Sequence, residues 1–327
     1  MRVAEHLNRS LHALLEKDPS VHVLGEDISD PYGGAFKITK GLSDRFGPRV
    51  MSTPLSEGGI VGVGAGLALA GDRAVVEIMF GDFATLAFDQ LVNFAAKSTT
   101  MYGRPVDVPL VVRLPTGGRR GYGPTHSQSL QKHFIGVPGL SVYEMSPFHD
   151  AEALFTEIFG SGRPAVFFED KVLYTKPMLS GGDGLHTFEV RDGWAVIRAE
   201  QNTEDVLVAP GGLTDRALTA LRDLLVEDEI ACTLLVPARL HPLDVTPVAD
   251  VLHAARRVHV AEDGTAGGTW GAEVARLLHE RLWGRLTAPI THISAPDSII
   301  PTAAHLEARC TVQAADIRAH IQRAISR

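Results

Sequence analysis

The side chains of this sequence that are able to do acid–base chemistry stand out in three short stretches. Glu57 opens an apolar segment, MFGDF occupies residues 79–83, and THSQS occupies residues 125–129. Carboxyl and imidazole groups are the commonest proton donors and acceptors in enzymes. Because α/β sheets bind their ligands at the carboxyl ends of the strands, we expect the three stretches to converge on one site.

The segment that begins with Glu57 predicts a helix from Ser56 to Ala70. Ser56 is a suitable N-cap, and Gly71 suits the left-handed residue that ends many helices. Glycines recur at every fourth position, on one helical face, where they permit close approach of another backbone. Two interpretations of Glu57 remain open. It is either a carboxylate favoured by the positive end of the helix, or a half-buried acid with a raised pKa aimed at a ligand.

Length, charge and cysteine content bound the class of protein. The chain of 327 residues is long enough for two domains with separate cores. Its net charge of −8 gives no reason to expect binding of nucleic acid or of an acidic membrane surface. Cys232 and Cys310 lie far apart in no metal-like spacing, which favours a reduced, cytoplasmic setting. The charged, amphipathic first residues predict neither a signal peptide nor a membrane span.

Strand-like and helix-like patterns alternate along the chain, which predicts an α/β fold of two doubly wound domains with mainly parallel sheets. In the first half, we expect elements over residues 3–17, 21–24, 39–46, 56–70, 74–80, 83–101, 109–114, 140–143, 151–159 and 165–168. In the second half, we expect them over residues 205–209, 214–225, 231–236, 258–261, 271–280, 290–293 and 316–325. Pro, Ser and Gly interrupt the pattern at 176–187, so we place the domains at 1–180 and 188–327.

Residues 115–128 form an expected loop that is rich in Gly and polar groups. A loop of this size without secondary structure is usually functional or disordered. We expect Arg119 to be a solvated edge residue. Arg120 lies nearer His126 and is the better candidate for pairing with an anionic group of a substrate or partner, its alternative being a solvated loop tip.

Longer stretches occur in an order that a known family shares, namely GEDISDPYGGAFKITKGLSDRFG, TPLSEGGIVGVGAGLALAG, EIMFGDF, AFDQLVNFAAK, HSQS, VAPGG, AEDGTAGGTWGAE and PDSIIP. With these motifs nearly the whole chain resembles the β subunit of the thiamin-diphosphate-dependent 2-oxo acid dehydrogenase E1 component, in the pyruvate, branched-chain and acetoin dehydrogenase group. The resemblance implies a transketolase-like pyrimidine-binding domain followed by a transketolase C-terminal domain. It also implies an α2β2 heterotetramer, in which the E1 α subunit supplies the diphosphate and Mg²⁺ site. This chain has no GDG…N diphosphate signature of that kind, which is consistent with a diphosphate site on the partner.

The resemblance also implies roles for individual residues. Glu57 would hydrogen-bond N1′ of the aminopyrimidine of the cofactor, and Leu55, Met79 and Phe83 would form the apolar wall around that ring. His126 would face the substrate carboxylate or the reaction intermediates, as a hydrogen-bond donor or proton carrier. The glycine-rich helix would pack between subunits. Some relatives bind K⁺ through backbone carbonyls, and the matching positions are Leu110, Ile158, Phe159, Ser161 and Arg163.

Three functions follow from these features. The first is decarboxylation of a 2-oxo acid with acyl transfer to a lipoyl domain of an acyltransferase, E2. The second is a transketolase-like or synthase-like transfer of an acyl or ketol group to a non-lipoyl acceptor, which the departure from the family at Leu130–Gln131 leaves open. The third is a non-catalytic scaffold, against which the presence of Glu57 and Phe83 argues.

Overall fold

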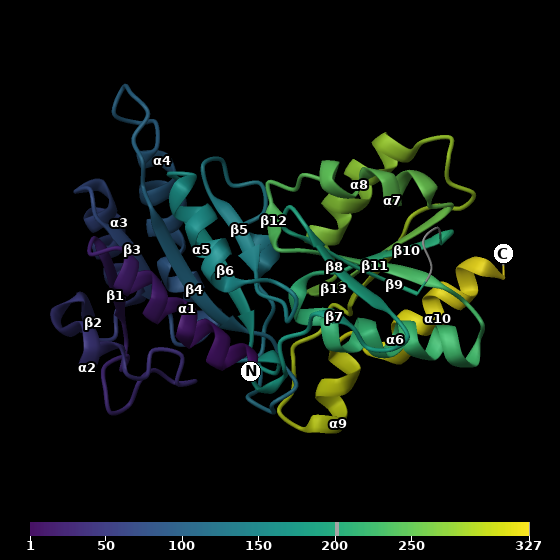
Figure 1. Ribbon diagram of the computed structural model, residues 1–327, viewed down its shortest axis with the longest axis horizontal. Coiled ribbons are helices and arrows are strands. Elements are labelled where there is room, and N and C mark those ends of the chain that lie inside the picture. The colour runs from purple at the N-terminus through teal and green to yellow at the C-terminus, as the bar shows by residue number, and fades with distance from the viewer. Residues whose placement is uncertain (200–202, 327) are drawn as a thin grey trace. The chain divides into compact units, whose positions relative to one another are not determined.

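The computed structural model describes residues 1–199 and 203–326, and its elements are labelled in Figure 1. The chain divides into two compact units, each with its own sheet. The first unit comprises Met1–Thr116, His133–Met145 and Asp150–Met178. The second comprises Gly117–Lys132, Ser146–His149 and Leu179–Arg327. The loop that carries His126 therefore belongs to the second unit, and Glu57 belongs to the first.

The first unit is built on parallel strands in the order β5-β6-β4-β3-β1-β2. The strands are β1 (Val21–Gly25), β2 (Val50–Ser52), β3 (Arg73–Glu77), β4 (Leu110–Thr116), β5 (Ser141–Glu144) and β6 (Ala165–Asp170). The helices are α1 (Val3–Lys17), α2 (Leu42–Phe46), α3 (Glu57–Leu69), α4 (Ala96–Ser98) and α5 (Ala151–Gly160). Strands β4, β5 and β6 are buried along their whole length, as in parallel sheets that are covered on both faces.

Strands β1 and β3 are neighbours, but the connections that follow them lead toward opposite edges of the sheet. From β1 the chain crosses to β2 on one side, whereas from β3 it crosses to β4 on the other side. Such a switch point is where open α/β sheets bind their ligands. The residues that follow the carboxyl ends of β1, β2 and β3 are therefore the ones that this topology gathers around a ligand.

The expected central helix is confirmed as α3, and Gly71 after its end has a φ of 105°. The expectation that the Ser56 hydroxyl caps this helix is wrong, because the side chain makes no cap hydrogen bond with the residues that the structure describes. A methyl group on Gly64 would lie 2.7 Å from Cγ2 of Val76. Glycine at this position therefore lets α3 pack directly on β3.

The single helix expected over residues 83–101 is wrong. Three short segments replace it, namely the 3₁₀ segment η2 (Gly81–Ala87), the π-helical segment η3 (Gln90–Ala95) and α4. A methyl group on Gly58 would lie 3.1 Å from the carbonyl oxygen of Leu86, and one on Gly62 would lie 3.2 Å from Oε1 of Gln90. Two glycines of the face expected to pack between subunits thus pack against η2 and η3 of the same chain.

A buried ion network lies in the sheet of the first unit, around Arg113 of β4. Its guanidinium donates to both oxygens of Glu169 at 2.7 Å and to Oε2 of Glu77 at 2.6 Å. The Tyr174 hydroxyl donates to Glu169 at 2.6 Å. Burial raises the pKa of Glu77, an effect that the charge of Arg113 opposes and that of Glu169 reinforces. Removing one partner of such a buried pair typically costs about 3–5 kcal/mol, so the network holds the end of β3 firmly in place.

The second unit has a mixed sheet in the order β14-β13-β10-β11-β9-β8-β7. Its strands are β7 (Gly181–Gly182), β8 (Thr187–Arg191), β9 (Trp194–Arg198), β10 (Asp205–Val208), β11 (Cys232–Pro237), β13 (Arg257–Thr265) and β14 (Thr291–Ala295). The short strand β12 covers Arg239–His241. The helices are α6 (Thr214–Glu227), α7 (Ala249–Ala254), α8 (Trp270–Leu282), α9 (Ala304–Glu307) and α10 (Ala314–Ile325).

The sequence analysis missed the antiparallel hairpin of β8 and β9, the latter of which pairs with β11. Asp192 and Gly193 form its two-residue turn with φ values of 42° and 77°. An Asp-Gly pair between two strand-like runs is a strong hairpin signal, and it was available in the sequence.

The core of the second unit lies between its sheet and the pair α6 and α10. It includes Leu207 of β10, Leu234 of β11, Leu221 of α6 and Ile317 of α10. Helices α7 and α8 lie on the other side of this sheet (Figure 1). Within the described residues, none of the helices combines the length and the apolarity that crossing a bilayer requires.

Candidate functional site

Acidic or aromatic residues follow the carboxyl ends of three neighbouring strands in the first unit. Glu26 comes directly after β1, Glu57 begins α3 after β2, and residues 79–83 follow β3. The close approach of Gly58 to η2 holds the first turn of α3 against this last segment. A methyl group on Gly81 would lie 3.1 Å from the carbonyl oxygen of Pro115, so the segment also lies against the end of β4. The fold thus brings two of the three expected stretches to the switch point.

Glu26 is a site residue that the sequence analysis missed. Its side chain is 4% exposed, and neither carboxyl oxygen accepts a hydrogen bond of ordinary geometry from any residue that the structure describes. Burial raises the pKa of Glu26, the charge of Glu57 raises it further, and the nearby N–H of Ser56 partly offsets both effects. Glu57 itself is 9% exposed. Burial and the nearby charge of Glu57 therefore both favour the protonated form of Glu26.

The raised pKa of Glu26 predicts a pH dependence of stability. The folded chain keeps this proton above the ordinary glutamate pKa, so its stability falls as the pH rises from that ordinary value to the raised one. Glu26→Gln has no proton to lose. Its melting temperature relative to the wild type should therefore rise across that window and stay level above it, measured by thermal unfolding from about pH 4 to pH 8.

The neighbouring Asp27 supplies the control for this prediction. It is exposed and has a φ of 53°, a conformation that asparagine tolerates well. Asp27→Asn removes only the smaller of the two charges that raise the pKa of Glu26, so it should follow the pH profile of the wild type much more closely than Glu26→Gln does. A Glu26→Gln profile parallel to that of the wild type would contradict a raised pKa at Glu26.

The apolar wall expected around a ring is partly formed in this unit. Met79 and Phe83 are half-buried, and the Phe80 ring lies between the rings of Phe83 and Phe36, with centroid distances of 6.1 and 5.7 Å. Leu55, by contrast, is 80% exposed. Leu55, two residues before Glu57, is therefore an exposed large apolar side chain and does not line an enclosed wall within this unit.

His126 lies in the second unit, within the loop 117–132. It is half-buried, and its Nδ1 lies 3.0 Å from the Thr125 hydroxyl oxygen. The ends of the loop are joined by a hydrogen bond from the Gly117 N–H to the Gln128 carbonyl oxygen at 3.1 Å. The convergence of His126 with Glu57 stays a prediction, since the two residues belong to different units.

The expectation that Arg119 is a solvated edge residue is wrong. Its guanidinium donates to Asp215 at 2.9 Å, and its side chain is 16% exposed. Asp215 is adjacent to Arg216, which pairs with Asp263 at 2.8 Å. The ion pair of Arg119 and Asp215 thus joins the loop 117–132 to α6. The two residues are 96 positions apart, so their pairing could not be predicted from local sequence spacing.

The positions predicted to bind K⁺ lie near one another in the first unit. The Val108 N–H donates to the Gly162 carbonyl at 2.8 Å, which joins the start of β4 to the turn after α5. The Ile158 carbonyl accepts from the Ser161 hydroxyl at 2.7 Å, and the Phe159 carbonyl accepts from the Gly162 N–H at 3.3 Å. The Ser161 N–H also donates to both of these carbonyl oxygens, at 3.2 Å to that of Ile158. A carbonyl-lined site formed with Leu110 and Arg163 stays a prediction.

An apparent GDG triplet at residues 182–184 is a local turn. The Asp183 carboxylate accepts from the N–H groups of Leu185 and His186, at 2.9 and 2.7 Å. Its other oxygen lies 3.2 Å from Nδ1 of His186. The carboxylate is therefore engaged in shaping the turn before β8.

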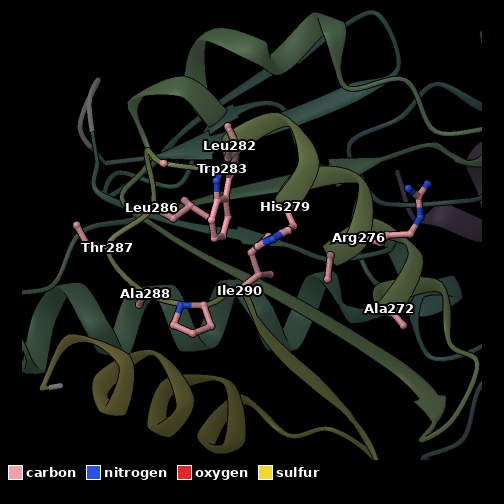
Figure 2. Close-up of a pocket in the computed structure, with 12 residues that line it drawn as sticks. Ala272, Arg276, His279, Leu282, Trp283, Leu286, Thr287, Ala288 and Ile290 are labelled. Atoms are coloured by element: carbon pink, nitrogen blue, oxygen red, sulfur yellow. The ribbon is translucent and has the colours of Figure 1, made fainter.

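A separate cavity of about 700 Å³ lies between α8 and residues 283–290 (Figure 2). Its lining is mostly apolar, with Leu282, Leu286 and Ile290 among the contributors. The rings of His279 and Trp283 lie 4.9 Å apart at its edge. The residues that line it include none of the predicted catalytic or cofactor-binding ones, so it is distinct from the site at the switch point.

Comparison with known families gives two matches that together cover most of the chain. Residues 1–177 match the transketolase pyrimidine binding domain, and residues 193–317 match the transketolase C-terminal domain. A solved structure described as a split gene transketolase, an inactive beta4 tetramer, superposes with a TM-score of 0.73 at 19% identity. It covers 98% of this chain and 97% of its own, and it shows the fold alone.

Curated relatives of similar length are more informative. The chain is 34% identical over its full length to pyruvate dehydrogenase E1 component subunit beta-1 of Oryza sativa subsp. japonica, of which it covers 87%. It is 33% identical, over 91% of its length and 87% of the relative, to the corresponding subunit of Leifsonia xyli subsp. xyli. It is also 34% identical to 2-oxoisovalerate dehydrogenase subunit beta 2 of Arabidopsis thaliana, over 92% of this chain and 83% of the relative. With the fold, the switch-point site and these relatives together, the chain belongs to the E1 β-subunit family of the 2-oxo acid dehydrogenases, which use thiamin diphosphate.

Proposed function

We propose that this chain is the β subunit of an E1 component that decarboxylates a 2-oxo acid and transfers the acyl group to a lipoyl domain. The observation that carries the proposal is the buried Glu57 at the start of a glycine-rich helix, beside the carboxyl group of Glu26 and the ligand-binding edge of a parallel sheet. The relatives named for pyruvate and 2-oxoisovalerate support a 2-oxo acid as the substrate class.

The residues at the switch point fit the aminopyrimidine half of thiamin diphosphate. Both carboxyl oxygens of Glu26 lack an ordinary hydrogen-bond partner among the described residues. The aromatic side chain of Phe83 and the thioether of Met79 are half-buried in the segment that follows β3. When bound, the cofactor would supply a nucleophilic carbon and an electron sink for the loss of CO₂. Glu57 would hold a proton at N1′ of the ring. Glu26 would lie beside it as the second buried carboxyl group of the site. Leu55, Met79 and Phe83 position the ring and exclude water.

His126 acts on the substrate side of the site in this proposal. Its imidazole donates a hydrogen bond to the substrate carboxylate, or carries a proton to the reacting carbon after CO₂ has left. Either role suits a half-buried ring that is close to a hydroxyl group on one nitrogen. The histidine thus acts after Glu57.

An E1 α subunit completes the site, binds the diphosphate and Mg²⁺, and forms an α2β2 heterotetramer with this chain. Exposed apolar side chains just before α3, on α3 and on η2 support a partner there, with Leu55 80%, Val63 55% and Leu86 63% exposed. The further partner is a lipoyl acyltransferase, E2. K⁺ binds at the carbonyls around Leu110 and the end of α5. The setting is cytoplasmic, which the two free cysteines and the bacterial relatives support.

The proposal predicts that the chain is inactive by itself. The purified chain and its co-expressed complex with an α subunit are to be compared for thiamin diphosphate binding by calorimetry. Decarboxylation of pyruvate and of 2-oxoisovalerate is then followed with an artificial electron acceptor. We expect tight cofactor binding and turnover from the complex alone, because the diphosphate site is on the partner.

Two results would contradict parts of this proposal. Turnover by the isolated chain would overturn the division of the site between subunits. A complex that binds the cofactor but decarboxylates neither acid would overturn the dehydrogenase function. If the complex decarboxylates but acylates no lipoyl domain, the transketolase-like or synthase-like alternative takes its place.

A further inference from the structure

The loop that carries His126 is fastened to a buried carboxylate far along the chain. Glu307, the last residue of α9, is 2% exposed. One of its oxygens accepts a hydrogen bond from the Arg119 N–H at 2.7 Å. The other accepts from the Gly121 N–H at 3.1 Å. A single carboxylate thus binds two alternate amides of the loop.

The backbone of the loop is shaped around that carboxylate. Arg119 has a φ of 70° and Gly121 a φ of 69°, so both residues are in the left-handed region. Such conformations turn nearby N–H groups toward one side and form a concave anion-binding backbone. A methyl group on Gly118 would lie 3.0 Å from Oε1 of Glu307, so a larger residue there would press on the carboxylate. Glycines 118 and 121 therefore suit the binding of the Glu307 carboxylate by this loop.

Further contacts fix the rest of the loop to the same part of the second unit. The Arg119 side chain pairs with Asp215, and a methyl group on Gly123 would lie 2.8 Å from the Thr302 hydroxyl. The His126 N–H donates to the Gly123 carbonyl at 3.4 Å. The His126 N–H is thus bonded to a residue that lies two positions after Gly121, whose own N–H Glu307 binds.

We propose that Glu307 is a positioning residue, which sets the conformation of the loop and thereby the position of the His126 imidazole. The proposal rests on the role given to His126 above. Without the carboxylate, two N–H groups lose their acceptor and compete for other partners, so the loop leaves its left-handed conformation. The histidine then loses its place, while Glu57 and the cofactor-binding residues of the first unit are untouched.

The test uses Glu307→Ala and Glu307→Gln in the full chain, with Glu280→Ala as the matched control. Glu280 is an acid on α8, with its side chain 67% exposed and paired to Arg276. In the complex with the α subunit, we expect Glu307→Ala to lower kcat for decarboxylation by roughly 10²-fold, the scale of a misplaced catalytic group. Exchange of the cofactor C2–H should stay within about threefold of wild type, because that step does not involve His126. Glu307→Gln should fall between, since it retains one acceptor oxygen.

Chemical rescue separates positioning from a merely structural role. Sodium formate should restore part of the kcat of Glu307→Ala, because a small carboxylate can refill the space between the two amides, whereas sodium chloride should not. Hydrogen–deuterium exchange of residues 117–128 in the isolated chain should be faster in Glu307→Ala and slow again in formate. Unchanged kcat, or a lost kcat with unaltered loop exchange and no rescue, would overturn the proposal. If the wild-type complex itself does not decarboxylate, the proposed function fails, while the exchange experiment still reports on the loop.

Discussion

Glu57→Gln should slow C2–H exchange of bound thiamin diphosphate by about 10²–10⁴-fold in the complex with the α subunit. Glutamine retains the size of the side chain and one acceptor oxygen but cannot share a proton with N1′. The position is 9% exposed at the start of α3, so water cannot readily take over this role. The exchange rate is measured by deuterium incorporation at C2 after acid quenching.

Ser56→Ala is the control for this experiment. Ser56 precedes Glu57, is exposed, and makes no cap hydrogen bond with the described residues through its side chain. Its removal should leave the exchange rate close to that of the wild type. If the exchange rate of Glu57→Gln remained within about threefold of wild type, Glu57 would have no part in activating the cofactor.

Much of the first unit was predictable because its signals are local. The apolar run of α3, the glycine after it and the buried strands each follow from a short stretch of sequence. Even there, the segment 83–101 was expected to be one α-helix, because an apolar pattern this short does not distinguish α from 3₁₀ or π hydrogen bonding. Local pattern therefore predicts that a helical segment exists better than it predicts its type.

Ion pairs between residues that lie far apart in the sequence could not be predicted from local patterns. Glu77 interrupts an apolar run in β3, and its partner Arg113 lies in β4. Arg119 has its partner Asp215 in α6. Nothing near either residue indicates the pairing, because ion pairs between elements depend on the completed fold.

Glu26 is a different case, because its position directly after a strand of the parallel sheet can be inferred from the sequence. It follows the strand β1, as residues 79–83 follow β3, and both lie at the carboxyl edge of one parallel sheet. The family resemblance covered this stretch without assigning a role to the acid, and burial in the fold is what distinguishes it.

His126→Ala should lower the decarboxylation rate of the complex by about 10²–10⁴-fold while C2–H exchange stays near normal. In the proposed mechanism the imidazole acts on the substrate, whereas the groups proposed to act on the cofactor ring are in the first unit. His253→Ala, which removes an exposed histidine of α7, is the matched control and should leave both rates unchanged. Turnover of His126→Ala at the wild-type rate would remove the histidine from the mechanism.

Arg120→Ala then identifies what the loop recognises. Arg120 lies between the two residues whose N–H groups Glu307 holds, so its backbone is fixed whichever group its side chain contacts. Loss of activity with the artificial electron acceptor as well as with a lipoyl domain would mean that the guanidinium recognises the substrate carboxylate. Loss confined to lipoyl acylation would mean that it contacts an acidic surface of the lipoyl domain instead. If both activities are unchanged in Arg120→Ala while His126→Ala is inactive, the histidine is the functional group of this loop, and the arginine contributes to neither recognition step.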